Sequence, residues 1–221
     1  MAVHVDVWSD YVCPFCYLEE PVLNEARKEF GDRLKVRWRA FELRPEPVPT
    51  LPPRGEYLLD IWERAVYPMA RDRGMKLQLP PVQPRSRLAL EAAEFAGSAG
   101  KFDAMHTALF RAFFEEGRDI GDVEVLVEIG EANGLEGDAL RRALQGGLYR
   151  AQVLEDEALA ASLELTGVPA LLVREENVPI ESARVLSGAQ PLFMVRAAIE
   201  SISANSRATR AGIQSPARDG E

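Results

Sequence analysis

Both cysteines of this chain lie in one short segment, SDYVCPFCYLEE, which spans residues 9–20. Two residues separate Cys13 from Cys16, and a pair at this spacing can form a reversible disulfide. If Cys13 is the N-cap of a helix and Pro14 is its first residue, the positive end of the helix dipole stabilises a Cys13 thiolate. The spacing therefore predicts dithiol exchange, in which Cys13 attacks a partner disulfide and Cys16 resolves the mixed disulfide.

A Cys-x-x-Cys pair is also typical of half a zinc site, or it is incidental. A structural zinc ion needs about four ligands, whereas this chain offers no further cysteine and only two histidines, His4 and His106. Two cysteines are also too few for a framework of structural disulfides. We therefore expect neither a metal nor a bound cofactor, and we interpret the pair as redox-active.

The cysteines follow a predicted strand and open a predicted helix. Residues 3–8 are apolar and β-branched at alternate positions, and apolar residues recur at helical spacing over residues 14–30. Residues 34–40 alternate between apolar and basic side chains, which predicts a second strand parallel to the first. A strand that leads into a helix is the context that a redox Cys-x-x-Cys motif requires.

A proline-rich segment then marks the boundary between this strand–helix–strand unit and a helical region. RPEPVPTLPPR holds five prolines, which predicts a stiff extended connection. Helical periodicity follows, with helices expected at residues 57–73, 86–97, 101–116, 122–133, 137–144 and 149–165. After TGVP the pattern returns to two short strands, ALLV and ARVLSG, which predict an antiparallel hairpin, and then to a closing helix.

This order predicts an α/β fold with two parts. Residues 1–48 and 160–203 are expected to form a small sheet domain, and residues 49–159 are expected to form a helical insertion within it. Residues 204–221 lack apolar periodicity and are expected to form a mobile tail.

The charge of the chain excludes one class of partner. Its 26 Lys and Arg against 35 Asp and Glu give a formal net charge of -9 at pH 7, whereas phosphate backbones require clustered basic residues. We therefore expect no nucleic acid. No apolar run approaches the roughly 18 residues that cross a bilayer, and the N-terminus lacks a signal-peptide pattern. We accordingly expect no membrane contact and a cytoplasmic location.

Five segments together resemble the DsbA family of the thioredoxin superfamily, and most closely its cytoplasmic branch that includes the frenolicin-biosynthesis-type proteins. They are VWSDYVCPFCY, FELRPEPVP, LFRAFFEEGRDIGDVEVL, LTGVPALLV and LSGAQP. The resemblance implies a thioredoxin-like fold with a large all-helical insertion. It also implies that Pro169 is cis and lies beside the two cysteines. The backbone of Val168 would then pair with an extended substrate, which Pro14 and Phe15 would border.

Two departures from the family pattern bear on activity. Strong oxidants of the family carry a histidine within the motif, where this chain has Phe15, and some relatives carry a second, distal cysteine pair that this chain lacks. Cys13 and Cys16 are therefore expected to depend on an external thiol redox partner, for which glutathione is a candidate. The expected substrates are protein or peptide thiols and disulfides.

Two other functions stay open. The insertion pattern also resembles glutathione-dependent isomerases or transferases such as 2-hydroxychromene-2-carboxylate isomerase, which use a serine near the position of Cys13 to activate glutathione. A non-catalytic binding module with a vestigial redox site is the third candidate. The presence of both Cys13 and Cys16 favours dithiol exchange over either alternative.

Residues around the motif have weaker interpretations. Asp10 is a candidate for tuning the attacking thiolate, although an aspartate at a strand end is usually a turn or cap residue. His106 is expected to be packed or solvated rather than to face a cleft. Trp8, Tyr11 and Phe15 are expected to form an apolar rim around the attacking thiol, although core packing explains Trp8 equally well.

Overall fold

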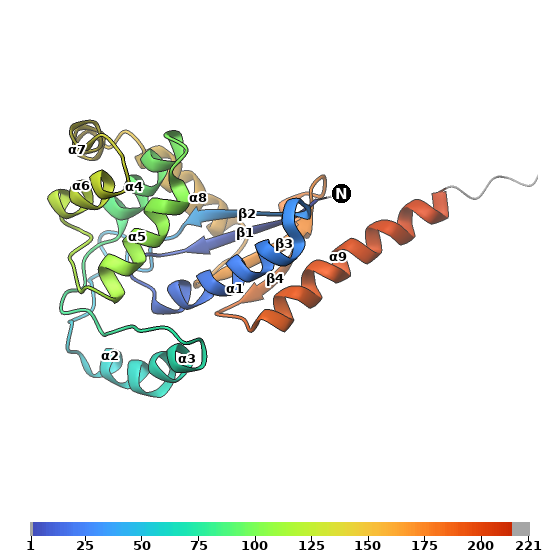
Figure 1. Cartoon of the computed structure of the whole chain (residues 1–221), viewed down its shortest axis with the longest axis horizontal. Coiled ribbons are helices and arrows are strands. Elements are labelled where there is room, and N and C mark those ends of the chain that lie inside the picture. Colours follow the sequence, from blue (N-terminus) through green and yellow to red (C-terminus); the bar gives the residue numbers. More distant parts are fainter. Residues whose placement is uncertain (1, 214–221) are drawn as a thin grey trace, which may run out of the picture.

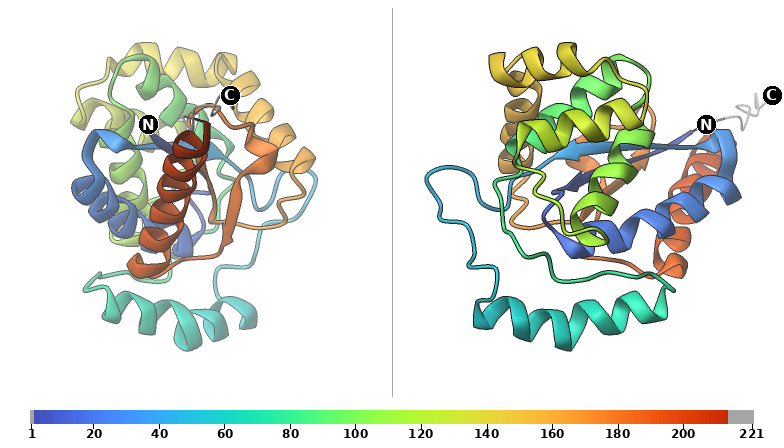
Figure 2. Two further views of the ribbon diagram at one scale, coloured as in Figure 1. Left: turned by 90° about the vertical axis from the view of Figure 1, so that its right-hand side faces the viewer. Right: turned by 60° about the vertical axis from the view of Figure 1, so that its left-hand side comes forward.

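The computed structural model describes residues 2–213, which form a four-stranded sheet with helices on both faces (Figures 1 and 2). The elements, in chain order, are β1 (Val3–Ser9), α1 (Pro14–Phe30), a 3-10 turn (Gly31–Arg33), β2 (Leu34–Ala40), α2 (Glu56–Ile61), a π-helical turn (Trp62–Val66), α3 (Tyr67–Asp72), α4 (Arg87–Ser98), α5 (Phe102–Phe114), α6 (Val123–Ala132), α7 (Gly137–Gly146), α8 (Arg150–Ser162), β3 (Ala170–Glu175), a 3-10 turn (Ile180–Ser182), β4 (Arg184–Ser187) and α9 (Leu192–Ile213).

The strand order is β2-β1-β3-β4, so β1 is a central strand. It pairs with β2 in parallel, with Val5 opposite Val36, and with β3 in antiparallel fashion, with Val5 opposite Val173. β3 and β4 form an antiparallel hairpin in which Leu171 lies opposite Leu186. The predicted α/β fold is confirmed by this sheet and the helices around it. β1 takes a central position because most of its residues are buried, as expected of a strand covered on both faces.

Each face of the sheet is covered by different helices. α1 and α9 cover one face, where Leu23 and Ile199 pack against Val5. α8 covers the other face, where Ala160 packs against Trp8, and the Trp8 indole donates a hydrogen bond to the carbonyl oxygen of Asp156 at 2.9 Å. Trp8 therefore belongs to the core and not to a rim around the cysteines. The domain boundary predicted at residue 160 falls within α8.

Helices α4 to α7 form a bundle beside the sheet, and α2 and α3 form a separate arm (Figures 1 and 2). This arm, residues 56–72, was predicted as one helix, and it is interrupted by the π-helical turn Trp62–Val66. Trp62 and Val66 face the protein and join the same apolar cluster as Phe110 and Phe114 of α5. The arm is thus part of the main core despite its peripheral position.

The last helix is longer than the sequence predicts. α9 continues to Ile213, so residues 204–213 of the tail, which lack apolar periodicity, are helical; the mobility expected of this tail stays a prediction. SANSRATRAGI contains alanine and arginine, which favour helices, and the next proline is Pro216. A helix can therefore propagate here without an apolar stripe. The remainder of the predicted tail, residues 214–221, lies outside the described residues.

Candidate active site

The two cysteines lie where β1 ends and α1 begins. Cys13 is the N-cap residue of α1, in extended conformation, and Pro14 occupies the start of the helix. The amides of Cys16 and Tyr17 donate to the carbonyl oxygen of Cys13 at 3.1 and 3.4 Å. No side chain caps this helix end. The positive end of the helix dipole is consequently directed at Cys13.

The two thiols differ in their surroundings. Both are free, and their residues are 3% exposed at Cys13 and 0% exposed at Cys16. Burial, followed by the neighbouring Cys13 thiol, raises the pKa of Cys16 well above its usual range, while the Ser9 hydroxyl and the Asp10 backbone oppose this rise. Cys16 is therefore a protonated thiol behind Cys13, as expected of a resolving cysteine.

A segment distant in sequence completes the site. The peptide bond between Val168 and Pro169 is cis, and the carbonyl oxygen of Val168 accepts a hydrogen bond from the Cys13 Sγ at 3.5 Å. The carbonyl oxygen of Pro169 accepts a hydrogen bond from the amide of Gly188 at 2.8 Å, which ties this segment to the end of β4. The fold thus brings both predicted parts of the site together.

A groove of about 230 Å³, which we name the Cys13 groove, opens beside the Cys13 thiol. One wall carries the predicted residues Cys13, Pro14, Phe15 and Val168. Pro169 adjoins this wall through Val168 but does not line the groove. The opposite wall is the α2–α3 arm, from which Tyr57, Leu58, Ile61 and Trp62 line the groove. The groove therefore has apolar walls on both sides of the Cys13 sulfur.

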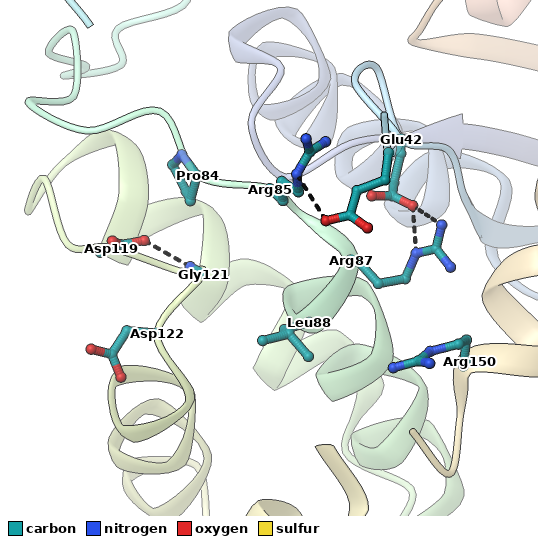
Figure 3. A pocket seen from close by; sticks show the side chains of 10 residues that line it. Glu42, Pro84, Arg85, Arg87, Leu88, Asp119, Gly121, Asp122 and Arg150 are labelled. Carbon is teal, nitrogen blue, oxygen red and sulfur yellow. Dashed lines mark hydrogen bonds and ion pairs between the residues drawn. The ribbon is translucent and has the colours of Figure 1, made fainter. Parts of the chain in front are cut away.

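A larger cavity of about 750 Å³ shares Pro84 and Arg85 with the Cys13 groove. Figure 3 shows that its walls are charged, with Arg87 directed at Glu42 and Arg150 entering from α8. Arg87 forms ion pairs with Glu42 and, at 3.4 Å, with Glu157. This cavity could not be predicted from the sequence, because its walls come from segments that are far apart in the chain.

Asp10 is fully buried and acts as a turn residue. Its carboxylate accepts hydrogen bonds from the amides of Leu43 at 2.7 Å and Val12 at 3.2 Å. Burial nevertheless raises the pKa of Asp10 to about 6, because desolvation outweighs these hydrogen bonds. The carboxylate thus joins the turn before Cys13 to the segment after β2, and a direct effect on the thiolate stays a prediction.

Tyr11 and His106 lie in the core behind the motif. The Tyr11 hydroxyl and the His106 Nδ1 are 2.9 Å apart, and the His106 ring packs against Trp38 and Phe110. Burial lowers the pKa of His106 to about 3. His106 is therefore packed, as expected, and of the predicted rim residues Phe15 lines the groove, whereas Tyr11 does not.

A buried carboxylate missed by the sequence analysis lies on α1. Glu19 is fully buried, accepts a hydrogen bond from the amide of Gln190 at 2.7 Å, and lies 3.5 Å from the Arg73 guanidinium. Arg73 also donates to the carbonyl oxygens of Leu18 and Gln190. Burial raises the pKa of Glu19 to about 7, despite the ion pair with Arg73. These contacts fasten the end of the α2–α3 arm to α1.

The described residues offer neither a metal site nor a membrane-spanning helix. Within residues 2–213, no group of three or more His, Cys, Asp or Glu side chains could hold a metal ion. In the same part of the chain, no helix has the length and apolar character to cross a membrane.

Comparison with known proteins identifies relatives along most of the chain. Uncharacterized protein YwbO of Bacillus subtilis is 36% identical over 185 residues, which are 81% of this chain and 90% of YwbO. The crystal structure of the probable DsbA oxidoreductase SCO1869 from Streptomyces coelicolor is similar with a TM-score of 0.74 and 25% identity, covering 99% of this chain and 94% of that chain.

Two further solved structures share the fold. 2-Hydroxychromene-2-carboxylate isomerase has a TM-score of 0.71 at 21% identity, over 96% of this chain and all of the other. The cytosolic disulfide reductase DsbM from Pseudomonas aeruginosa with GSH has a TM-score of 0.64 at 22% identity, over 94% of this chain and 99% of the other.

The model of one family matches residues 4–200, and its description is DSBA-like thioredoxin domain. This range contains all of the sheet except Val3, both cysteines and the Val168 segment that contacts Cys13. The protein therefore belongs to the DSBA-like thioredoxin domain family.

Proposed function

We propose that this protein is a cytoplasmic thiol–disulfide oxidoreductase or isomerase that exchanges disulfides with protein or peptide substrates. The observation that carries the proposal is the arrangement of three groups: the Cys13 thiol at the N-terminus of α1, the Val168 carbonyl that it contacts, and the buried Cys16 thiol behind it. The cytosolic reductase DsbM, which shares the fold, supports the proposed compartment.

The reaction has two steps. The Cys13 thiolate attacks one sulfur of a substrate disulfide, forms a mixed disulfide and releases the other substrate sulfur as a thiolate. Cys16 then loses its proton and attacks the Cys13 Sγ, so that the second substrate sulfur leaves with the electron pair. The products are a reduced substrate and a disulfide between Cys13 and Cys16. The reverse sequence oxidises a substrate dithiol.

The Cys13 groove suits an extended substrate. Its apolar walls, which include Phe15 and Trp62, fit an apolar side chain next to the reacting cysteine. Backbone pairing with the Val168 segment would hold such a substrate with little sequence selectivity. The adjoining charged cavity, which begins at Arg85, leaves room for a larger polypeptide.

We further propose that no prosthetic group takes part and that the redox group is the Cys13–Cys16 pair itself. An external thiol must then return the pair to its starting state after each turnover. Glutathione is the proposed partner, because the DsbM structure that shares this fold contains GSH.

The test is an equilibrium titration of the purified protein in glutathione buffers. Trp62 lines the groove, so tryptophan fluorescence is expected to follow the disulfide, and thiol counting checks the stoichiometry. A reversible two-electron couple supports the proposal, and its position relative to about −230 mV separates an oxidant or isomerase from a reductase. Cys13→Ser is expected to abolish turnover, whereas Cys16→Ser is expected to accumulate mixed disulfides. Unchanged turnover in both variants would contradict the mechanism.

The second candidate is a glutathione-dependent isomerase. It is favoured by the likeness to 2-hydroxychromene-2-carboxylate isomerase along the whole of that chain. The same titration distinguishes it, because an isomerase of this type would form a stable glutathione complex or adduct and no disulfide between Cys13 and Cys16.

A further inference from the structure

The α2–α3 arm forms one wall of the Cys13 groove, yet the path of the chain does not fix where the arm lies. Residues 41–55 before the arm and residues 73–86 after it contain neither a helix nor a strand (Figure 2). Trp62 and Val66 attach the arm to the apolar core. Apolar burial is non-directional, whereas hydrogen bonds require specific distances and angles. The separation of the two groove walls is therefore most sensitive to the polar contacts of the arm.

Arg73, which directly follows α3, supplies these contacts. Its guanidinium donates hydrogen bonds to the carbonyl oxygens of Leu18 and, at 2.8 Å, of Gln190, and it lies 3.5 Å from the Glu19 carboxylate. We name these four residues the Arg73 clamp. Within residues 2–213, no other residue from 56 to 73 forms a hydrogen bond or ion pair with a part of the fold beyond the arm and the loops that flank it. The Arg73 side chain is 14% exposed and the Glu19 side chain is fully buried, so water competes little for these contacts.

The Arg73 clamp also reaches the opposite wall of the groove. The backbone amide of Gln190 donates to the Glu19 carboxylate at 2.7 Å, and its side-chain amide donates to the carbonyl oxygen of Gly188 at 3.1 Å. The amide of Gly188 donates in turn to the carbonyl oxygen of Pro169 at 2.8 Å, next to Val168, which lines the groove. A continuous series of hydrogen bonds thus joins the arm, α1 and the Val168 segment, which are the parts that border the groove.

We propose that Arg73 is a positioning residue for the substrate, because its clamp holds the arm against the Val168 segment so that the groove fits one extended chain with an apolar residue beside its cysteine. This inference rests on the proposed function. Arg73 does not line the groove, so it acts on the substrate through Tyr57 and Trp62 of the arm, which do. Without the Arg73 guanidinium the arm keeps its apolar anchor but loses its fixed position, so its contact with an apolar substrate side chain weakens. The clamp thereby sets selectivity for that side chain, while the reactivity of Cys13 stays the same.

The test compares two peptides that contain the same disulfide and have either leucine or serine beside the reacting cysteine. Selectivity is the ratio of kcat/KM for the leucine peptide to kcat/KM for the serine peptide. A partly unfolded variant lowers both values by the same factor, so the ratio reports the groove alone. Arg73→Met is expected to lower this ratio about threefold or more, since an apolar contact in a pocket is worth about tenfold or more in selectivity and the displaced arm loses part of it. The rate with the small disulfide reagent DTNB, which reports the reactivity of Cys13, is expected to stay within about twofold of the wild type.

Arg71→Met is the matched control. Arg71 lies at the same end of the arm, is exposed and takes no part in the Arg73 clamp, so this variant is expected to keep the wild-type ratio. Hydrogen–deuterium exchange measures the clamp without reference to activity. The amides of residues 56–72 are expected to exchange about tenfold faster in Arg73→Met, because the arm opens more easily, and at the wild-type rate in Arg71→Met.

If Arg73→Met does not fold, Arg73→Lys serves for the same test, since lysine keeps the charge beside Glu19 but lacks the planar fork of donors that reaches both carbonyl oxygens. A wild-type selectivity ratio in the variant that folds would overturn the inference, and so would an equal loss in Arg71→Met. Unchanged hydrogen exchange of the arm in that variant would overturn the clamp alone. A wild-type protein that exchanges no disulfide with either peptide would overturn the proposed function, and the role of Arg73 in selectivity with it.

Discussion

The Cys13 Sγ donates a hydrogen bond to the carbonyl oxygen of Val168 at 3.5 Å, across 155 residues of sequence. A thiolate has no proton to donate, so this bond exists in the thiol form alone. Loss of the Cys13 proton therefore releases the Val168 carbonyl oxygen, which can then accept a hydrogen bond from a substrate amide. In the proposed mechanism, the same event activates the nucleophile and frees a substrate contact.

The first prediction concerns the reactivity of the two thiols. In the reduced native protein, a short pulse of iodoacetamide is expected to modify Cys13 and to leave Cys16 unmodified, because Cys13 lines the groove whereas Cys16 is fully buried with a raised pKa. Peptide mass spectrometry measures the modification. Both residues are expected to react in denaturant, and equal labelling of both in the native state would contradict the assigned order of the thiols.

The second prediction concerns the arm wall of the Cys13 groove. Tyr57 lines the groove and is 61% exposed, so Tyr57→Ser should change stability little. We expect it to lower kcat/KM about fivefold, equivalent to ~1 kcal/mol, for disulfide peptides with an apolar residue beside the cysteine. The rate with DTNB should not change.

Phe193 offers the matched control for this variant. It is an aromatic residue of similar exposure, 65%, at the start of α9 and does not line the groove. Phe193→Ser is expected to keep the wild-type kcat/KM with the same peptides. An equal loss in both variants would show that the arm does not contribute a substrate wall.

The third prediction concerns Asp10. Asp10→Ala removes the acceptor for the amides of Val12 and Leu43, and a buried donor left without a partner is costly, so the free energy of unfolding should fall by about 2 kcal/mol. Urea denaturation followed by circular dichroism measures the loss. Asp32→Ala, at an exposed position, is the control and should change stability little. A loss below about 0.5 kcal/mol at Asp10 would contradict its structural role.

The fourth prediction concerns pH. The pKa of Glu19 is raised from 4.5 to about 7 in the folded protein, so between these values the folded state binds more protons than the unfolded state. Stability from this group is full below pH 4.5 and is lost as the pH rises through about 7, by up to about 3 kcal/mol. Glu19→Gln removes the titration.

The difference in unfolding free energy between the wild type and Glu19→Gln should therefore become less favourable to the wild type from pH 5 to pH 8. Chemical denaturation at a series of pH values measures it. Glu25→Gln, an exposed position on the same helix, should show no such trend. A difference that does not vary with pH would mean that Glu19 titrates normally.

The elements near the cysteines could be predicted because their signals are local. Period-two alternation identified β1 and β2, and the prolines of residues 44–54 marked the end of that unit. The π-helical turn Trp62–Val66 has no such signal, since its residues are compatible with an ordinary helix. The extension of α9 was missed because propensity alone, without an apolar stripe, sustains it.

The site could be predicted only in part. Cys13 and Cys16 lie three positions apart in the sequence, and TGVP marked the segment that meets them. A wall of the groove could be expected from the helical insertion, residues 49–159, but which part of the insertion forms it could not be inferred. The position of the α2–α3 arm depends on Arg73 reaching Glu19, and a glutamate within a helix usually indicates a surface position.

The long helical insertion between β2 and β3 also delays, during synthesis, the contacts that cover the two cysteines. The ribosome completes the two cysteines near the start of synthesis, whereas the Val168 contact and the second neighbour of β1 arrive about 155 residues later. At typical elongation rates this delay is on the order of ten seconds. Throughout that interval the nascent chain carries two uncovered thiols and an unpaired edge of β1, so its most reactive groups are exposed before the structure that restrains them exists.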